Sequence, residues 1–184
     1  MNHRISWYYE TILRDLLIYK IVAQNCHQLP TVSKINLNTT CKEISKDKKN
    51  LSKILILMEL LSGQKPVMVK AKKSISQWKL RKGYPIGAKV TLRNQMMFSF
   101  LDRLIHTALC KDREFRGITL TKVKGKQGYS FSIGFSDSFL FPEIESQYEK
   151  FQSSYGFNLN CQTTSHEVEE LKLLVSALHL PLLS

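Results

Sequence analysis

The stretch Gly63–Arg93 reads GQKPVMVKAKKSISQWKLRKGYPIGAKVTLR. It contains two short apolar runs, 66–71 and 86–93, each with the length and composition of a β-strand. Between them, residues 72–85 are rich in Lys and Arg and show no strand alternation, so they predict a basic loop or hairpin tip. The remaining elements are expected to assemble around these two strands.

Polar and apolar side chains alternate in the second of these strands and in an earlier strand, Val32–Asn38. Because successive side chains of a strand point to opposite faces, each strand is expected to have one buried and one polar face. The polar positions include Asn36 and Asn38 in the earlier strand and Lys89, Thr91 and Arg93 in the later one. Such groups suit phosphates, ribose hydroxyls and base edges, although an ordinary solvated strand face has the same pattern.

Helical periodicity and strand alternation along the rest of the chain predict a mixed fold. Helices are expected at 6–23, 47–62, 94–110 and 167–178, and further strands at 129–135 and 157–163. Asn94 is the expected N-cap of the third helix. Because strands and helices do not alternate regularly, the pattern favours one α+β domain over residues 1–184, with a mostly antiparallel sheet. Helices would pack on one face of this sheet and leave the other face free to bind RNA.

Charge is distributed unevenly over the 184 residues, whose formal net charge is +12. Residues 60–101 contain nine Lys or Arg side chains and no Asp or Glu, whereas residues 137–170 have a net charge of −6. A strongly basic segment predicts a polyanionic partner, either nucleic acid or an anionic membrane surface. The RNA-binding surface is therefore expected on residues 65–93 and on the polar strand beside them, and the acidic stretch is expected to face solvent or protein.

The basic segment also contains Trp78 and Tyr84, whose rings offer stacking surfaces beside the cations. Two other interpretations remain open: the charges could form an ordinary solvated face, and Trp78 could fold back onto the core. The absence of acidic residues, and the close backbone approach that Gly83 and Gly87 permit, favour a loop that contacts folded RNA.

No motif in the sequence predicts catalysis, a cofactor or a metal site. Nucleophile-elbow and phosphate-loop motifs are absent. The four cysteines form no C-x-x-C pair and match no zinc-site spacing. No apolar run reaches the roughly 20 residues of a membrane span. The chain is therefore expected to be a binding protein and not an enzyme.

Several sequence blocks occur together in an order that resembles a known family. They are GQKP at 63–66, KAKKS at 70–74, RKGYPIG at 81–87, KVTLR at 89–93, FLDRLI at 100–105, RG at 116–117 and FPEI at 141–144. From about residue 23 to the end, the chain strongly resembles large-subunit ribosomal protein five, the 5S-rRNA-binding protein of bacterial and organellar ribosomes. The resemblance implies an α+β fold and a structural role in the central protuberance of the large subunit.

The resemblance also implies partners and site residues. The sheet face is expected to bind 5S rRNA, beside large-subunit rRNA, through Asn36, Asn38, Gln64, Lys65, Lys89, Thr91 and Arg93. The basic loop is expected to reach the peptidyl-site tRNA through Lys72, Lys73, Ser74, Trp78, Lys79, Arg81 and Lys82. Loops within 111–138 are expected to contact a small-subunit bridge protein through Arg113, Arg116, Lys124 and Lys126, and other ribosomal proteins are expected as neighbours.

The N-terminal helix, residues 1–22, diverges from the family and is rich in Ile, Leu, Tyr and Asn. Glu10, Arg14 and Asp15 interrupt its apolar positions, unlike those of a signal peptide, and it is not a Ser- and Arg-rich transit peptide. These features predict an organelle-encoded mitochondrial protein, with a bacterial cytoplasm or a plastid as alternatives. The alternative function is a membrane-peripheral module, anchored by Trp78 and the neighbouring lysines.

Overall fold

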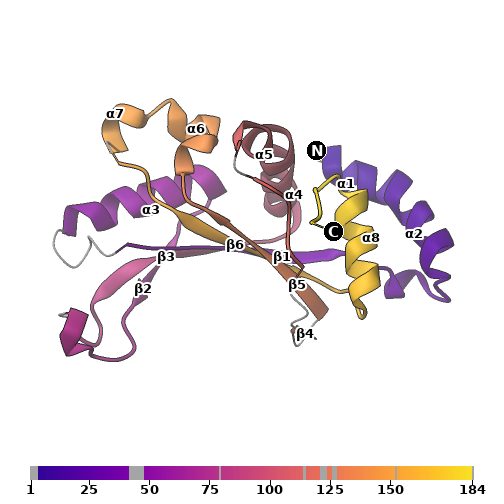
Figure 1. Ribbon diagram of the computed structural model, residues 1–184, viewed down its shortest axis with the longest axis horizontal. Coiled ribbons are helices and arrows are strands. Elements are labelled where there is room, and N and C mark those ends of the chain that lie inside the picture. Colours follow the sequence, from indigo (N-terminus) through magenta and orange to yellow (C-terminus); the bar gives the residue numbers. More distant parts are fainter. Residues whose placement is uncertain are drawn as a thin grey trace. The chain divides into compact units, whose positions relative to one another are not determined.

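The computed structural model describes residues 4–41, 48–78, 80–113, 115–120, 124–125, 128–151 and 153–183. Within these residues, six strands form one sheet in the order β2-β3-β1-β6-β5-β4 (Figure 1). Their bounds are β1 Val32–Thr40, β2 Val67–Lys70, β3 Pro85–Leu92, β4 Lys124–Gly125, β5 Gly128–Phe135 and β6 Phe157–Thr163. The sheet is antiparallel, as the registers of β2 with β3 and of β4 with β5 illustrate.

The helices complete an α+β fold, so the predicted fold class is confirmed. Their bounds are α1 Arg4–Tyr8, α2 Arg14–Ile21, α3 Lys48–Ser62, α4 Asn94–Arg103, α5 Leu109–Lys111, α6 Pro142–Glu145, α7 Tyr148–Phe151 and α8 Val168–Ala177. Two π-helical turns, η1 (Tyr9–Leu13) and η5 (Leu104–Ala108), join α1 to α2 and α4 to α5. Each predicted helix and strand overlaps one of these elements.

The chain divides into two compact units. Unit 1 contains Met1–Ile35, Leu92–Ile133 and Asn160–Ser184, and unit 2 contains Asn36–Thr91 and Gly134–Leu159. The prediction of one domain over residues 1–184 stays a prediction.

Unit 2 packs helices against one side of its strands. Figure 1 shows α3, α6 and α7 along the same side of the strands in this unit. Three aromatic rings form the centre of its core: Phe135 stacks on Phe157 with 5.0 Å between ring centroids, and Phe141 lies 5.8 Å from Phe157. All three side chains are buried. Apolar burial of this kind is the main contribution to stability, because it removes hydrocarbon surface from water.

Unit 1 is built mainly from helices. Arg4 to Ile21 form a continuous helical segment whose inner residues, Leu13 and Leu17, are buried. Helix α1 contacts α4, and α2 contacts α8. Helix α8 begins with a capping box, in which Glu167 and Glu170 each accept a hydrogen bond from the other's backbone N–H. This cap satisfies amide groups that a helix start would otherwise leave without partners.

The structure corrects one local expectation and adds two short helices. Arg93, and not Asn94, is the N-cap of α4, and Asn94 instead has a φ of 49°. A short polar side chain makes this left-handed conformation tolerable for Asn. Helices α6 and α7 were not predicted, because four residues are too few to show a helical period. Pro142 stands in the first turn of α6, where its missing N–H has no intrahelical acceptor to lose.

Tyr9 links the N-terminal helical segment to the residues before β1, and this link predicts a pH dependence of stability. Its hydroxyl donates to the carbonyl oxygen of Pro30 over 3.0 Å. Burial raises the pKa of Tyr9 to about 12, although the nearby Arg14 guanidinium acts in the opposite direction. The raised pKa favours the neutral phenol in the folded state, so this stabilisation is complete below pH ~10 and is lost as the pH rises toward 12.

We therefore expect Tyr9→Phe to lower the free energy of unfolding by about 1 kcal/mol at pH 8, because the hydrogen bond is lost. The difference from the unmodified chain should shrink between pH 9 and pH 12. Urea unfolding across this range measures it, with Tyr19→Phe as the control because Tyr19 is 84% exposed. A difference that stays constant with pH would contradict the expectation.

Candidate nucleic-acid interface

Alternating side chains of β1 and β3 give unit 2 one buried and one polar strand face. On the buried face, Leu37 and Val90 are almost inaccessible to solvent. The other face, which we call the polar strand face, consists of Asn36, Asn38, Lys89 and Thr91. Asn36 is half-buried there, and the other three side chains are exposed.

A hydrogen bond between β1 and β3 orients the amide of the polar strand face. Thr91 Oγ1 donates to Oδ1 of Asn36 over 3.0 Å. Because the hydroxyl holds the amide oxygen, the two N–H groups on Nδ2 remain as donors for a ligand. Donors of this kind suit phosphate oxygens, ribose hydroxyls and the acceptor atoms of bases.

Gln64 and Lys65 lie in the turn that joins α3 to β2. The Ser62 hydroxyl donates to the carbonyl oxygen of Met58 over 2.6 Å and accepts from the backbone N–H of Gln64 over 3.2 Å. Gly63 follows the helix with a φ of 65°, the left-handed conformation expected at this position. The turn leaves Lys65 exposed and Gln64 half-buried in the same unit as the polar strand face.

The predicted basic loop is a hairpin tip with defined backbone contacts. Ile75 and Leu80 exchange two backbone hydrogen bonds of 2.9 and 3.1 Å. The backbone N–H of Lys82 donates to Ser74 Oγ over 3.0 Å. These bonds close the tip on itself, so its side chains are held at the end of a hairpin and not on a free coil.

Trp78 lies at this tip, in the short 3-10 turn Ser76–Trp78, and is 67% exposed. The alternative that Trp78 folds back onto the core is therefore wrong. An exposed indole among cations can stack on a base or a ribose while its neighbours contact phosphate.

The cationic groups of this loop are unpaired in the part of the chain that the structure describes. Lys72, Lys73, Ser74, Arg81 and Lys82 are all exposed. None of the four cations among them forms an ion pair with a described carboxylate. Their charge is therefore available to phosphates, whose neutralisation releases counterions. Lys79 lies outside the described residues.

The remaining predicted residues belong to unit 1. Arg93 directly follows β3 and is exposed, and Arg113 and Arg116 are exposed in the connection after α5. The side chain of Lys124 and the whole of Lys126 lie outside the described part of the chain. The predicted contact of these loops with a bridge protein stays a prediction.

One residue of unit 2 that sequence reasoning did not select has the same character as the polar strand face. Asn158 is exposed on β6, between the buried Phe157 and Leu159, and β6 is the neighbour of β1. Its Oδ1 lies 3.3 Å from the position that a Cβ on Gly134 would take. The alternation in 157–163 was the signal for this residue, and it was used only to predict the strand.

The described residues contain no helix that is both long and apolar enough to cross a membrane. Among them there is also no group of three or more His, Cys, Asp or Glu side chains that could hold a metal ion. Burial raises the pKa of the Cys161 thiol, so this group stays neutral and behaves as a small apolar side chain.

Family models and known relatives match nearly the whole chain. The model described as Ribosomal protein L5 matches residues 25–81, and the model for the C-terminus of the same ribosomal family matches residues 85–182. Large ribosomal subunit protein uL5m of Reclinomonas americana is 43% identical over 180 residues, covering 98% of each chain. The uL5 protein of Nitrosomonas europaea is 38% identical over 182 residues, and the uL5c protein of Rhodomonas salina is 36% identical over 181, each again covering 98% of both chains.

Proposed function

Because the chain belongs to the ribosomal protein L5 family, and is therefore a structural constituent of the large ribosomal subunit, we propose that its polar strand face binds 5S rRNA in the central protuberance. The predicted family is confirmed, and the family is not enzymatic. Membership also implies association with rRNA and with other ribosomal proteins. Within unit 2, Gln64 and Lys65 would add to the contact, and Arg93, which follows β3 in the chain, would supply a further cation.

The hydrogen bond between Thr91 and Asn36 is the observation that carries this proposal. It leaves amide donors on a strand face that also exposes Lys89 and contains no carboxylate among its four residues. A face of this composition repels no phosphate and offers both neutral donors and a cation.

We propose that the hairpin tip contacts the peptidyl-site tRNA. The support is its four exposed cations and the exposed Trp78, which together combine phosphate neutralisation with base or ribose stacking. Family membership favours RNA over a lipid surface as the partner of this tip, so the membrane-peripheral alternative has less support.

A bridge contact and the compartment complete the proposal. Exposed Arg113 and Arg116, with Lys124 and Lys126 in the same connection, are proposed to meet a small-subunit protein.

The 43% identity to a mitochondrial-type uL5m supports a mitochondrial ribosome, while the bacterial and plastid-type relatives at 38% and 36% identity support the two alternatives.

Asn36→Asp tests the polar strand face. The substitution replaces two N–H donors with a negative oxygen, which repels phosphate, and we expect 5S rRNA affinity to fall by about ten- to a hundredfold. Filter binding at one fixed salt concentration measures the change.

Asn50→Asp is the matched control, because it makes the same chemical change in the first turn of α3, where an acid is tolerated. Its affinity should stay within about twofold of the unmodified chain, a change of less than ~0.5 kcal/mol. An equal loss in both variants would reveal a general charge effect and contradict the assignment of the site.

Replacing Lys72, Lys73, Arg81 and Lys82 together by Gln tests the hairpin tip. We expect weaker tRNA binding and a shallower dependence of log K on log salt, by about one unit for each phosphate contact that is lost. Binding measured between low and high salt gives the slope.

The control replaces four exposed cations elsewhere by Gln: Arg14, Lys20, Lys150 and Lys172. This control removes the same total charge. If tRNA contacts the tip specifically, the control variant should keep nearly the same dependence of log K on log salt as the unmodified chain. Equal slopes for the two quadruple variants would contradict the tRNA contact, as would tip-dependent flotation with anionic liposomes in the absence of tRNA binding.

A further inference from the structure

A cavity of about 270 Å³ in unit 1 shares no residue with the polar strand face or the hairpin tip. It is open to solvent on one side and lined by α1, the π-helical turn η5 and the end of α8. Buried side chains, including Ile105 and Leu178, form its floor. The more exposed residues around it are Arg4, Trp7, Tyr8, His106 and His179.

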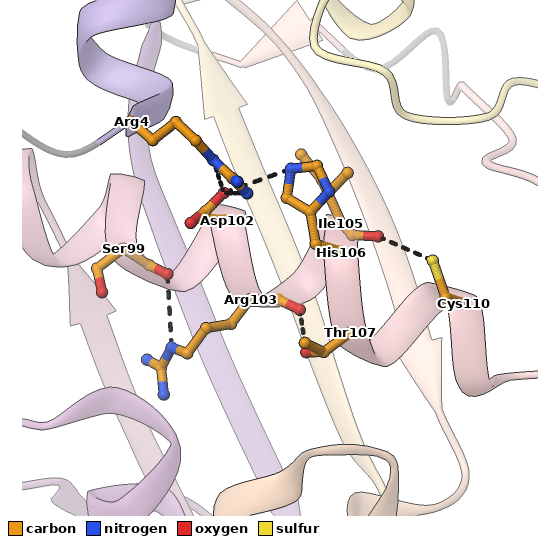
Figure 2. A network of polar contacts seen from close by, with 8 residues as sticks. All are labelled: Arg4, Ser99, Asp102, Arg103, Ile105, His106, Thr107 and Cys110. Carbon is orange, nitrogen blue, oxygen red and sulfur yellow. Dashed lines mark hydrogen bonds and ion pairs between the residues drawn. The ribbon is translucent and has the colours of Figure 1, made fainter.

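Arg4 and His106 are both positioned by one carboxylate (Figure 2). Arg4 donates to Asp102 Oδ1 through Nη2 at 2.6 Å and through Nε at 3.2 Å. His106 Nε2 lies 3.4 Å from the same oxygen, and Figure 2 shows both side chains reaching toward Asp102. Two of the five guanidinium N–H groups are used in this contact, so three remain for a ligand at the cavity.

Tyr8 holds the ring of His179, another residue that lines the cavity. The two rings stack with 5.7 Å between centroids and an angle of 25°, and Tyr8 Oη lies 3.2 Å from His179 Nε2. His179 follows α8 with a φ of 59°, where glycine is the usual residue. His is among the few residue types that adopt this conformation more often than most side chains do.

From this arrangement we propose that the cavity binds one unpaired nucleotide of RNA. The base lies against the rings of Trp7, Tyr8 and His179, and Arg4 contacts the adjoining phosphate. Unpaired bases are recognised by stacking on aromatic, histidine and arginine planes, and all of these are present here. Trp7 is 53% exposed, so its indole surface is accessible.

The polar groups at the cavity favour a nucleotide over an apolar protein segment. Asp102, which pairs with Arg4, is not among the described residues that line the cavity, and Arg4, His106 and His179 offer hydrogen-bonding groups there. An apolar protein side chain would contact the floor but would use none of these polar groups. A nucleotide uses the floor and rings for its base and the cation for its phosphate.

The proposal does not depend on 5S rRNA binding by unit 2, because every residue that it uses belongs to unit 1. It adds to the family's association with rRNA a separate, single-nucleotide contact near the N-terminal helical segment.

Trp7 fluorescence tests the proposal directly. The chain has two tryptophans, so the full-length Trp78→Phe variant retains Trp7 as its only one. Titration with the single-stranded RNAs hexaadenylate and hexauridylate should quench Trp7 emission in a saturable way. Arg4→Gln should weaken this binding by about tenfold or more, the usual size of a lost charged hydrogen bond. Because the Arg4 side chain is 64% exposed and the Asp102 side chain is only partly buried, this variant should still fold.

Substitutions of Trp7 separate stacking from simple apolar contact. We expect Trp7→Phe to retain binding of fluorescein-labelled hexaadenylate and Trp7→Leu to lose about tenfold in affinity, measured by anisotropy in the variant whose hairpin-tip cations are replaced by Gln. Tyr19→Leu is the control, since it removes an exposed aromatic ring from the same helical segment outside the cavity.

Two results would overturn the proposal. One is a Trp7 emission that neither RNA changes, or that changes equally in the Arg4→Gln variant. The other is equal affinity of Trp7→Leu and Trp7→Phe, which would identify the cavity as an apolar docking site for protein. Loss of 5S rRNA binding in the Asn36→Asp variant would leave both measurements unaffected.

Discussion

The close approach of β3 to β1 at Gly87 is the contact on which the polar strand face depends. A Cβ placed on Gly87 would overlap the carbonyl oxygen of Thr39, so only glycine fits between the two strands. On its other side, Thr39 donates its hydroxyl to the carbonyl oxygen of Gly156 over 2.7 Å, just before β6 begins. Strand β1 is therefore fixed against both neighbours. Because a shift of one residue would exchange the two faces of a strand, this register decides that Asn36 and Asn38 are accessible and Leu37 is buried.

Charge adds a second constraint within the same unit. The hairpin tip gathers cations at the end of a strand pair, and no acidic residue occurs between positions 60 and 101 to neutralise them. Four of the seven acidic residues of unit 2 occur in its last segment, for example Glu149 in α7, and the other three precede position 60. Electrostatic self-repulsion at such a tip costs stability, and an anionic partner relieves it. Apolar burial therefore stabilises the core, whereas a bound anion would stabilise the tip.

The sequence was most informative where a single periodicity dominates. The alternation in β1 and β3 predicted both the strands and the polar side chains between buried ones, because each face is set by local spacing. Gly63 after α3 has the left-handed conformation that is usual for glycine at the end of a helix, which is a similarly local effect. The prediction of Asn94 as the N-cap of α4 was wrong because Asn suits both an N-cap and a left-handed turn.

Features that depend on contacts far apart in the chain could not be read from spacing. Arg4 meets Asp102, and Tyr8 meets His179, across separations of 98 and 171 residues. Each residue taken alone resembles an ordinary surface side chain, so nothing local indicated the cavity. The exposure of Trp78 could not be predicted either, because an indole at a loop tip can pack inward or outward with equal local propensity.

The register of β1 against β3 is tested most directly by comparing Gly87→Ala with Gly134→Ala, each measured for urea unfolding and for 5S rRNA affinity. A Cβ on Gly134 would meet only the Asn158 side chain, at 3.3 Å, so this variant should unfold within about 0.5 kcal/mol of the unmodified chain. Gly87→Ala is predicted to lose about 1–3 kcal/mol of unfolding free energy, as expected for overpacking, and to bind 5S rRNA more weakly. A Gly87→Ala chain as stable as the Gly134→Ala chain, with unchanged affinity, would contradict the account.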